Sequence, residues 1–447
     1  MNDNKISKNS IVAKFAVPIS FLILFFLAAN FTDCDLVTFW KRRSHLTDLV
    51  VDMIPPDFSY IQKILLPLFY TIQMSVTGTV LGIFFALVLS PFGAANLGFP
   101  AVIRRILRIV IQILRSFPAL ILALTATFLF GLGTFAGTFA ITLYTFAIMT
   151  KLTYEDASAA DVKAYQALRA MGVSKYVAYI HGILPEIIPG FLTNALYLLE
   201  TNVRHSSILG YVGAGGIGLL LNEKISWLEY DKVGTILLML FLTVCVIEYF
   251  SRYLAALIRK ERTIKKEQAR LLLLFLAALF LICTFTLSLP DFSRTSPQTL
   301  RNMFAGFLQP DWSFFFSAEK DGLGYLLLET VCIAFIGTVI GAIVSAPLAF
   351  LNTKRFVPAP VSFLFNLVIM VIRSVPFLVY GLIFIRVSGP GAFTGVLTLA
   401  VCSIGLLTKR FTEALDALDP RPYHALLAMG VRPLPVSYTH LTLPTTS

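Results

Sequence analysis

The sequence predicts an all-α membrane protein with many spans, in which one helical unit occurs twice. Hydrophobic residues make up 57% of the 447 residues and charged residues only 14%, and the mean hydropathy is +0.79. Because ordinary soluble domains are about a quarter charged, this composition excludes that class. Long apolar runs recur along the chain, and two segments repeat at a constant distance, which indicates a duplicated polytopic architecture.

Ten apolar runs are candidates for membrane-spanning helices, which need about 20 residues each. In the first half of the chain they lie near residues 11–30, 65–91, 108–131, 133–150, 188–210 and 233–252. In the second half they lie near 271–289, 323–351, 360–388 and 392–408. The first run follows basic residues as a signal peptide would, but the absence of a clear small-residue cleavage site favours a retained helix.

Basic residues indicate the orientation. Residues 252–270 carry seven Lys and Arg between two apolar runs, which is typical of a cytoplasmic linker. Counting spans outward from this linker places the N-terminus and both repeated polar segments in the cytoplasm, and the loops 31–64 and 290–322 outside. The excess of 36 Lys and Arg over 25 Asp and Glu then reflects cytoplasmic loops, and no basic groove with interleaved aromatics indicates nucleic-acid binding.

The duplication is visible residue by residue. Lys151–Val173 and Lys409–Val431 lie 258 residues apart and agree at 11 of 23 positions. Arg115-Ser116-Phe117-Pro118 recurs at the same offset as Arg373-Ser374-Val375-Pro376. A period this long indicates an internal duplication and not a solenoid.

We therefore expect two domains. Residues 1–262 form the first copy with about six transmembrane helices, and residues 263–435 form a second, incomplete copy with about four. Residues 436–447 are polar, rich in Thr and unlike the first copy, so they are assigned no function. Because the second copy lacks a counterpart of residues 200–218, the chain as given is expected not to support transport alone.

The repeated segment near residues 151–189 is too polar to span and rich in helix-forming Ala. Gly172 permits a sharp stop or a left-handed turn. A short helix, a glycine break and a second short helix would form a compact knob below the bilayer, once in each copy. Such a knob suits docking into a groove of a cytosolic partner, and the alternative is an amphipathic helix on the membrane surface.

This segment resembles the EAA loop of ABC importer permeases, whose pattern is Glu-Ala-Ala, three residues, Gly, nine residues, Ile-x-Leu-Pro. The chain departs from it at Gln166, Leu168 and Gly182. In that family the loop is a coupling helix that sits in a cleft of the ATP-binding subunit. The resemblance therefore implies ATPase coupling through residues of both copies: Gln166, Ala167, Leu168, Gly172, Leu184, Pro185, His424, Ala425, Leu426 and Gly430.

The run from Glu200 to Gly218 is similar to the stretch after the EAA loop in permeases of phosphonate importers, and Arg115 to Leu120 resembles their third-span signature. The resemblance covers about residues 60–260 and 320–435. It implies an ABC importer permease fold in the cell membrane of a bacterium, with a cytosolic ATP-binding dimer, an extracytoplasmic binding protein and a small phosphorus oxyanion as substrate. It implies no enzyme activity, and the chain has no phosphate-binding GxxxxGK[ST] loop.

Ionisable residues inside a predicted span are the candidates for a substrate pathway. Glu200 and Arg204 are four residues apart, so they either pair with each other or line an aqueous path. Guanidinium groups suit oxyanions because they bind them in a bidentate manner. The candidate pathway residues are Arg115, Ser116, Glu200, Asn202, Arg204, Arg373 and Ser374.

Several other site types are disfavoured. Gly213–Gly218 matches GxGxxG but follows an apolar helix instead of a strand, so a dinucleotide site is not indicated, and its glycines are expected to permit close backbone packing. The five cysteines and five histidines form no metal-binding pattern, and no cofactor is predicted. Two alternatives stay open: a secondary transporter built from repeats, and a membrane-embedded lipid-modifying enzyme. The permease sequence leaves the particular oxyanion undetermined.

Overall fold

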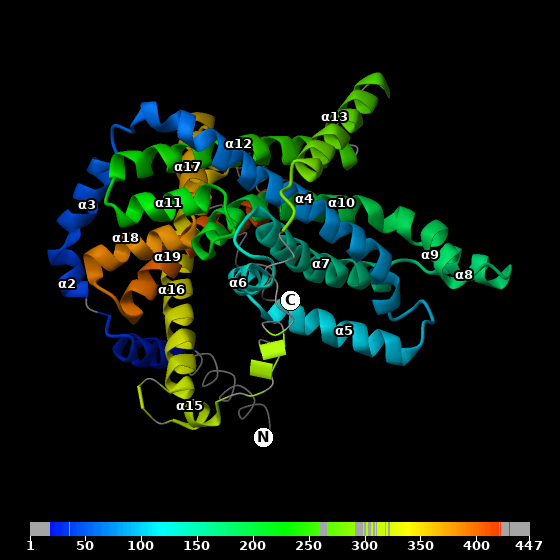
Figure 1. Cartoon of the computed structure of the whole chain (residues 1–447), viewed down its shortest axis with the longest axis horizontal. Coiled ribbons are helices and arrows are strands. Elements are labelled where there is room, and N and C mark those ends of the chain that lie inside the picture. The colour runs from blue at the N-terminus through cyan, green and yellow to red at the C-terminus, as the bar shows by residue number, and fades with distance from the viewer. Residues whose placement is uncertain are drawn as a thin grey trace. The chain divides into compact units, whose positions relative to one another are not determined.

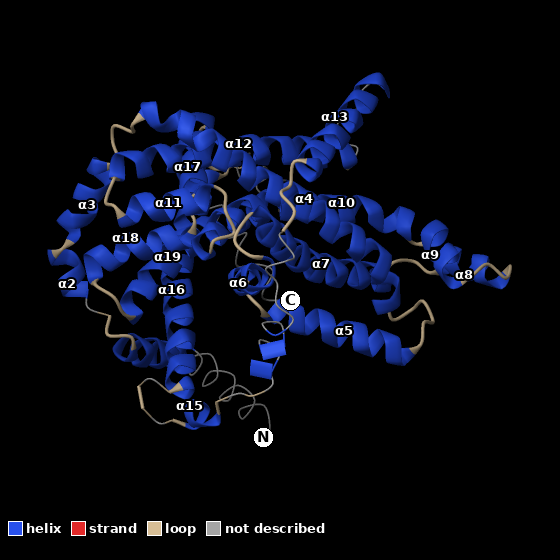
Figure 2. Cartoon of the chain, in the orientation of Figure 1, coloured by secondary structure: helices blue, strands red, loops and turns tan. Residues whose placement is uncertain are grey.

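A computed structural model describes residues 18–34, 36–259, 266–290, 311–317 and 322–419, with a few isolated positions between 298 and 320 and at 421 and 429. The described residues form helices joined by loops and turns and include no strand (Figure 2). Six described helices are each long and apolar enough to cross a membrane, and three bent helix pairs pass the same test together. The predicted all-α, multi-span fold is confirmed.

The chain divides into two compact units, one of residues 51–310 and the other of residues 1–50 with 311–447. The helices of the first unit, seen in Figure 1 in the blue-to-green part of the chain, are α4 (Ile61–Gly93), α5 (Ala101–Ser116), α6 (Ala119–Phe130), α7 (Thr134–Ala159), α8 (Lys163–Ala170), α9 (Lys175–Gly182), α10 (Leu184–Leu209), α11 (Ile217–Ser226), α12 (Tyr230–Ile258) and α13 (Lys266–Phe285). Short 3₁₀ turns, η1 (Phe58–Tyr60) and η2 (Gly210–Val212), precede α4 and follow α10.

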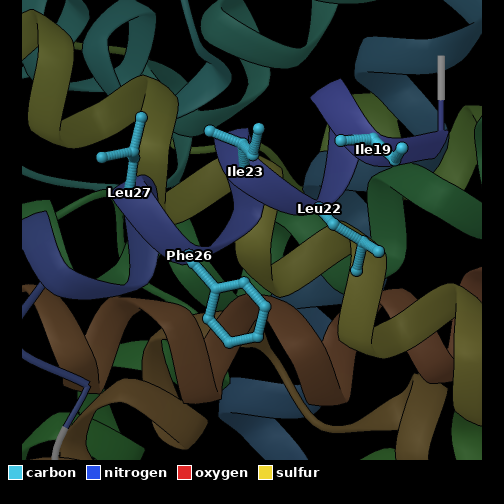
Figure 3. A pocket seen from close by; sticks show the side chains of 5 residues that line it. All are labelled: Ile19, Leu22, Ile23, Phe26 and Leu27. Atoms are coloured by element: carbon cyan, nitrogen blue, oxygen red, sulfur yellow. The ribbon is translucent and has the colours of Figure 1, made fainter. Parts of the chain in front are cut away.

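The second unit contains a helix over Pro18–Phe31 and its own series of labelled helices. These are α2 (Leu36–Lys41), α3 (Arg43–Asp52, which crosses the unit boundary), α15 (Trp312–Phe316), α16 (Leu323–Asn352), α17 (Ala359–Ser374), α18 (Phe377–Ser388) and α19 (Ala392–Ala417). The described part of the predicted first span is therefore helical. One face of this helix carries Ile19, Leu22, Ile23, Phe26 and Leu27 (Figure 3), all more than half exposed, as suits a surface in contact with lipid acyl chains.

Repeated glycines explain the close pairing of α4 with α7 and of α16 with α19. A Cβ on Gly78 would lie 2.7 Å from Ile141 Cγ2, and one on Gly82 would lie 2.7 Å from Thr145 Cβ. Their counterparts behave alike, because a Cβ on Gly341 would lie 2.4 Å from Ser403 Cβ. Small residues at this spacing let transmembrane helices pack backbone to backbone.

Two predicted spans are wrong as continuous helices. The run 108–131 is split into α5 and α6, which meet at 94°, and the run 360–388 is split into α17 and α18, which meet at 87°. Each break lies at a residue before proline: Phe117 has ψ 125° and Val375 has ψ 125°. Proline disfavours the helical conformation of the residue before it and supplies no N–H, so both helices end there.

The apolar run that opens each sequence copy packs in the compact unit of the other copy. Gln73 of α4 donates its amide N–H groups to Cys283 O, within α13, at 3.1 Å and to Thr286 Oγ1, just beyond α13, at 2.8 Å. Reciprocally, Phe21 packs edge-on against Phe335 with ring centroids 5.3 Å apart. The compact units thus differ from the sequence copies by an exchange of first helices.

Candidate coupling site and substrate pathway

A knob formed by α8 and α9 leads from the end of α7 to the start of α10 (Figure 1). Asp161 precedes the N-cap of α8 and accepts a hydrogen bond from Lys163 N at 2.9 Å. Gly172, with φ +85°, turns the chain after α8, and Val173 N donates back to Leu168 O at 3.2 Å. Leu184-Pro185 occupies the first turn of α10, where proline costs no helical hydrogen bond. The predicted helix, glycine break and helix are present.

The knob has a small, exposed face. Gln166, Ala167 and Ala170 are exposed on α8, and Met171 beyond it is 71% exposed. Leu168 is half-buried and packs on the apolar core of the knob. The small side chains of Ala167 and Ala170 lie near the flexible Met171 side chain. A partner groove can approach such a surface closely.

Gly182 explains one departure from the resembled pattern. A Cβ on this residue would lie 2.8 Å from Tyr165 N and 2.9 Å from Tyr165 Cα. The α8 backbone therefore passes directly over Gly182, and the isoleucine of the EAA pattern would overlap it. The α8 and α9 helices are therefore in direct backbone contact at this point.

The second copy has no described knob. The predicted coupling residues His424, Ala425, Leu426 and Gly430 lie outside the described residues, as do residues 436–447. The last long helix before them, α19, ends at Ala417.

The predicted pathway residues of α10 separate into two groups. Arg204 donates to Glu200 Oε1 at 2.7 Å, and these side chains are 15% and 6% exposed, respectively. Asn202 instead donates to Thr79 Oγ1 and Thr145 Oγ1, each at 2.8 Å, and is fully buried. Asn202 thus joins α10 to α4 and α7, whereas Glu200 and Arg204 form a nearly buried ion pair on another side of the helix.

The remaining candidates lie at the two helix breaks. Arg115 is exposed in the last turn of α5, and Arg373 is half-buried in the last turn of α17 against Gly405. Ser116 and Ser374 donate to carbonyl oxygens of their own helices, at 2.7 and 2.8 Å. The structure therefore places an arginine at the same point of both broken spans and gives the two serines local partners.

The glycine-rich run after α10 is a packing element. A Cβ on Gly218 would lie 1.8 Å from Ser207 O, and Gly216 has φ +74°. Ile217 N donates to Thr71 Oγ1 of α4 at 2.8 Å. Because neighbouring backbone fills this space, the run cannot cradle a dinucleotide phosphate.

A charged and aromatic cluster joins η1, α11 and α12, and the sequence pattern did not reveal it. The Lys224 side chain is 7% exposed and lies 3.0 Å from Glu223 Oε1 and 2.9 Å from Glu229 Oε2. Its ammonium is 4.2 Å from the Trp227 ring centroid and 5.5 Å from that of Tyr60. Burial opposes the charge, but hydrogen bonds to Glu229 and Glu223 raise the pKa of Lys224 overall. The cluster becomes visible only in the fold, which brings Tyr60 next to residues about 165 positions later in the sequence.

Acidification is expected to open this cluster. Hydrogen bonds from Lys232 and Lys224 hold the pKa of Glu229 below its usual value of 4.5. A carboxyl group whose pKa is lowered on folding stabilises the fold at pH values above its unfolded-state pKa. This contribution is lost as the pH falls through the folded-state pKa. Trp227 fluorescence should therefore change below pH 4.5, and in Glu229→Gln it should already be changed at neutral pH. Identical titrations of the two proteins would contradict the assignment.

Comparisons with known proteins identify the transport family to which this chain is similar. Residues 78–262 match the family described as "Binding-protein-dependent transport system inner membrane component". The chain is 31% identical over 217 residues to "Phosphite transport system permease protein PtxC" of Stutzerimonas stutzeri, covering 48% of this chain and 79% of that protein. It is 25% identical over 394 residues to "Phosphate-import permease protein PhnE" of Mycolicibacterium smegmatis, covering 86% and 73%. A solved structure of the MetNI methionine ABC transporter in an inward-facing conformation aligns with a TM-score of 0.41 and 20% identity, over 45% of this chain and 99% of that one.

Proposed function

Because the chain belongs to the family of inner membrane components of binding-protein-dependent transport systems, we propose that it imports phosphonate or a related small phosphorus oxyanion. The family consists of transport permeases and not of enzymes. One relative is named for phosphate import and another for phosphite transport, which supports an oxyanion substrate. The protein would lie in a bacterial cell membrane with its N-terminus in the cytoplasm, as the placement of basic residues favours.

The knob is the observation that carries the coupling role. Its exposed face, Gln166, Ala167 and Met171, would dock on a cytosolic ATP-binding subunit, and a dimer of such subunits would engage the knobs of both copies. An extracytoplasmic binding protein would deliver the substrate to the other side. Since α10 follows α9 after one residue, movement of the knob would displace the helix that carries Glu200 and Arg204.

The arginines are the groups suited to the substrate. A phosphonate or phosphite oxyanion accepts parallel hydrogen bonds from a guanidinium group. Arg115 and Arg373 stand at equivalent breaks, so two copies of the unit would present one arginine each. Alternating access would then expose these groups to either side as ATP closes the cytosolic dimer. A secondary transporter would need no such dimer, so co-purification of an ATP-binding subunit decides between the two functions.

Gly172→Val should release the ATP-binding subunit. A β-branched residue at φ +85° costs about 1–3 kcal/mol, while no atom lies within 4 Å of the position of its Cβ. The strain therefore acts on the turn between α8 and α9 and not on packing. Co-purification of the subunit should fall at least about fivefold, with membrane insertion unchanged.

Gly172→Asn is the matched control, since Asn tolerates positive φ better than other residues that carry a Cβ. It should retain most of the association. Normal association and uptake in Gly172→Val would refute docking through this knob.

A further inference from the structure

The loop between α4 and α5, residues 94–99, is fastened to the root of the knob; we call it the clasp loop. Asn96 Nδ2 donates to Ala157 O at 3.0 Å and to Ser158 O at 3.3 Å. Ala95 N donates to Ser158 Oγ at 3.1 Å. The loop is thus tied to the last turn of α7, immediately before the chain enters α8.

The clasp loop is also tied to both knob helices. The hydroxyl of Tyr165, in α8, donates to Leu97 O at 2.6 Å within the buried core. The ammonium of Lys175, in α9, donates to Gly98 O. Leu97 and Tyr165 belong to one apolar cluster with Ala178 and Tyr179 of α9. Knob and loop therefore share a single core, and one cannot shift without straining the other.

Beyond the clasp loop, the chain continues directly into α5. Its 16 residues span about 24 Å, and it packs beside α7 (Figure 1). Arg108 Nε donates to Gly93 O at 3.0 Å, and its guanidinium lies 5.0 Å from the Tyr154 ring centroid. The helix ends one residue past Arg115, so the clasp loop joins the knob to a candidate pathway arginine.

The second copy makes the same tie with different residues. Arg355, in the loop between α16 and α17, donates to Leu415 O at 3.0 Å and to Asp416 O at 3.3 Å. The offset of 259 residues that relates Gly78 to Gly337 relates Asn96 to Arg355, and the offset of 258 relates Ala157 and Ser158 to Leu415 and Asp416. Two different side chains therefore donate to equivalent carbonyl groups at the end of α7 and α19. The two copies thus make equivalent contacts through different residues.

We propose that Asn96 is a positioning residue that transmits knob movement to α5. This inference rests on the proposed function. The clasp makes α5 move with the knob as a second lever, parallel to the direct connection through α10. Displacement imposed by the ATP-binding subunit would then reach Arg115 at the break between α5 and α6. A tie with only a structural role would affect stability and leave the response of α5 to nucleotide unchanged.

The test compares two helices in one experiment. The full chain is purified with its ATP-binding subunit in lipid nanodiscs, and hydrogen–deuterium exchange is measured with ATP and with ADP. In the unmodified chain, exchange in both α5 and α10 should differ between the nucleotides. In Asn96→Ala combined with Tyr165→Phe, the α10 difference should persist, and the α5 difference should fall at least severalfold. Subunit binding should be unchanged.

Matched variants keep the result interpretable. Tyr176→Phe removes a hydroxyl that reaches Val88 O only at 3.4 Å on an exposed face, and it should leave the α5 response intact. Asn96→Arg, made alone, installs the residue of the second copy, and its α5 response should equal that of the parent chain. If the double variant accumulates poorly, Tyr165→Phe alone carries the test, because its ring still fills the core.

Three outcomes would overturn the inference. The first is an unchanged α5 response in the clasp variants, and the second is a failure of Asn96→Arg to respond as the parent does. The third is an unmodified chain that binds no ATP-binding subunit; this would overturn the proposed function as well, and it is recognised before any clasp variant is made.

Discussion

Arg204→Leu should nearly eliminate folded protein, whereas the double variant Glu200→Gln with Arg204→Leu should accumulate normally. The Glu200 side chain is 6% exposed and its carboxylate lies 2.7 Å from Arg204 Nη2. Removing one partner of a buried ion pair leaves an uncompensated charge and costs about 3–5 kcal/mol, whereas neutralising both can cost nothing. Size-exclusion profiles and thermal unfolding of detergent-extracted protein would measure the difference.

Uptake in the same variants separates a structural pair from a pathway pair. If Arg204 contacts the oxyanion, Arg204→Lys should keep some transport, since the charge remains while the bidentate fork is lost. The double variant should then fold but not transport. Uptake of phosphite restored to the parental level in the double variant would show that the pair is structural and would leave oxyanion contact to Arg115 and Arg373.

Helical geometry explains which of the pathway predictions could be made from the sequence. Glu200 and Arg204 are four residues apart and therefore share a face, and the structure shows the ion pair that this spacing allows. Asn202 lies about 200° around the helix from each of them, so it was predictable that it would face other neighbours. Its partners, Thr79 and Thr145, belong to helices whose packing no single-sequence pattern specifies.

The helix breaks were recoverable from the sequence, and the exchange of first helices was not. Pro118 and Pro376 each mark the preceding residue as a boundary, although the apolar character of both runs continues across it. The partner of an apolar span depends on which long-range surfaces fit together. Nothing local to residues 18–31 or to α13 indicates that Ala28 joins Ile336 and Val396 in one core or that Cys283 O accepts from Gln73.

The knob shows the same division between local and tertiary causes. Alanine content and Gly172 were sufficient to predict two short helices and a break, because these are local propensities. In the sequence, Gly182 is only a departure from the EAA pattern. Its role depends on the α8 backbone, which would lie 2.8 Å from a Cβ at this position. The clasp was invisible, since Asn96 and Arg355 differ in type and become equivalent only through the carbonyl groups to which they donate.

The largest effect of a single methyl group is expected at Gly218. In Gly218→Ala the new Cβ would lie 1.8 Å from Ser207 O and 2.7 Å from Ser207 C, both backbone atoms that no rotamer change can move. Gly210 makes the reciprocal close approach, since a Cβ on it would lie 2.4 Å from Leu219 N of α11. Relief requires separating α11 from the end of α10, which would break the hydrogen bond from Ile217 N to Thr71. Overpacking of this kind costs about 1–3 kcal/mol or more, so folded yield should fall at least about tenfold.

Gly190→Ala supplies the comparison, because it adds the same methyl group to α10 where no atom lies within 4 Å. Alanine favours a helix over glycine by about 1 kcal/mol, so this variant should unfold at the same temperature or higher. Equal yields of Gly218→Ala and Gly190→Ala would show that the glycine-rich run is loosely packed, and its close approach to α4 and α10 would then need another explanation. A loss confined to Gly218→Ala would establish that the run fixes the junction of α10 and α11, the point at which the helix carrying Glu200 and Arg204 is anchored.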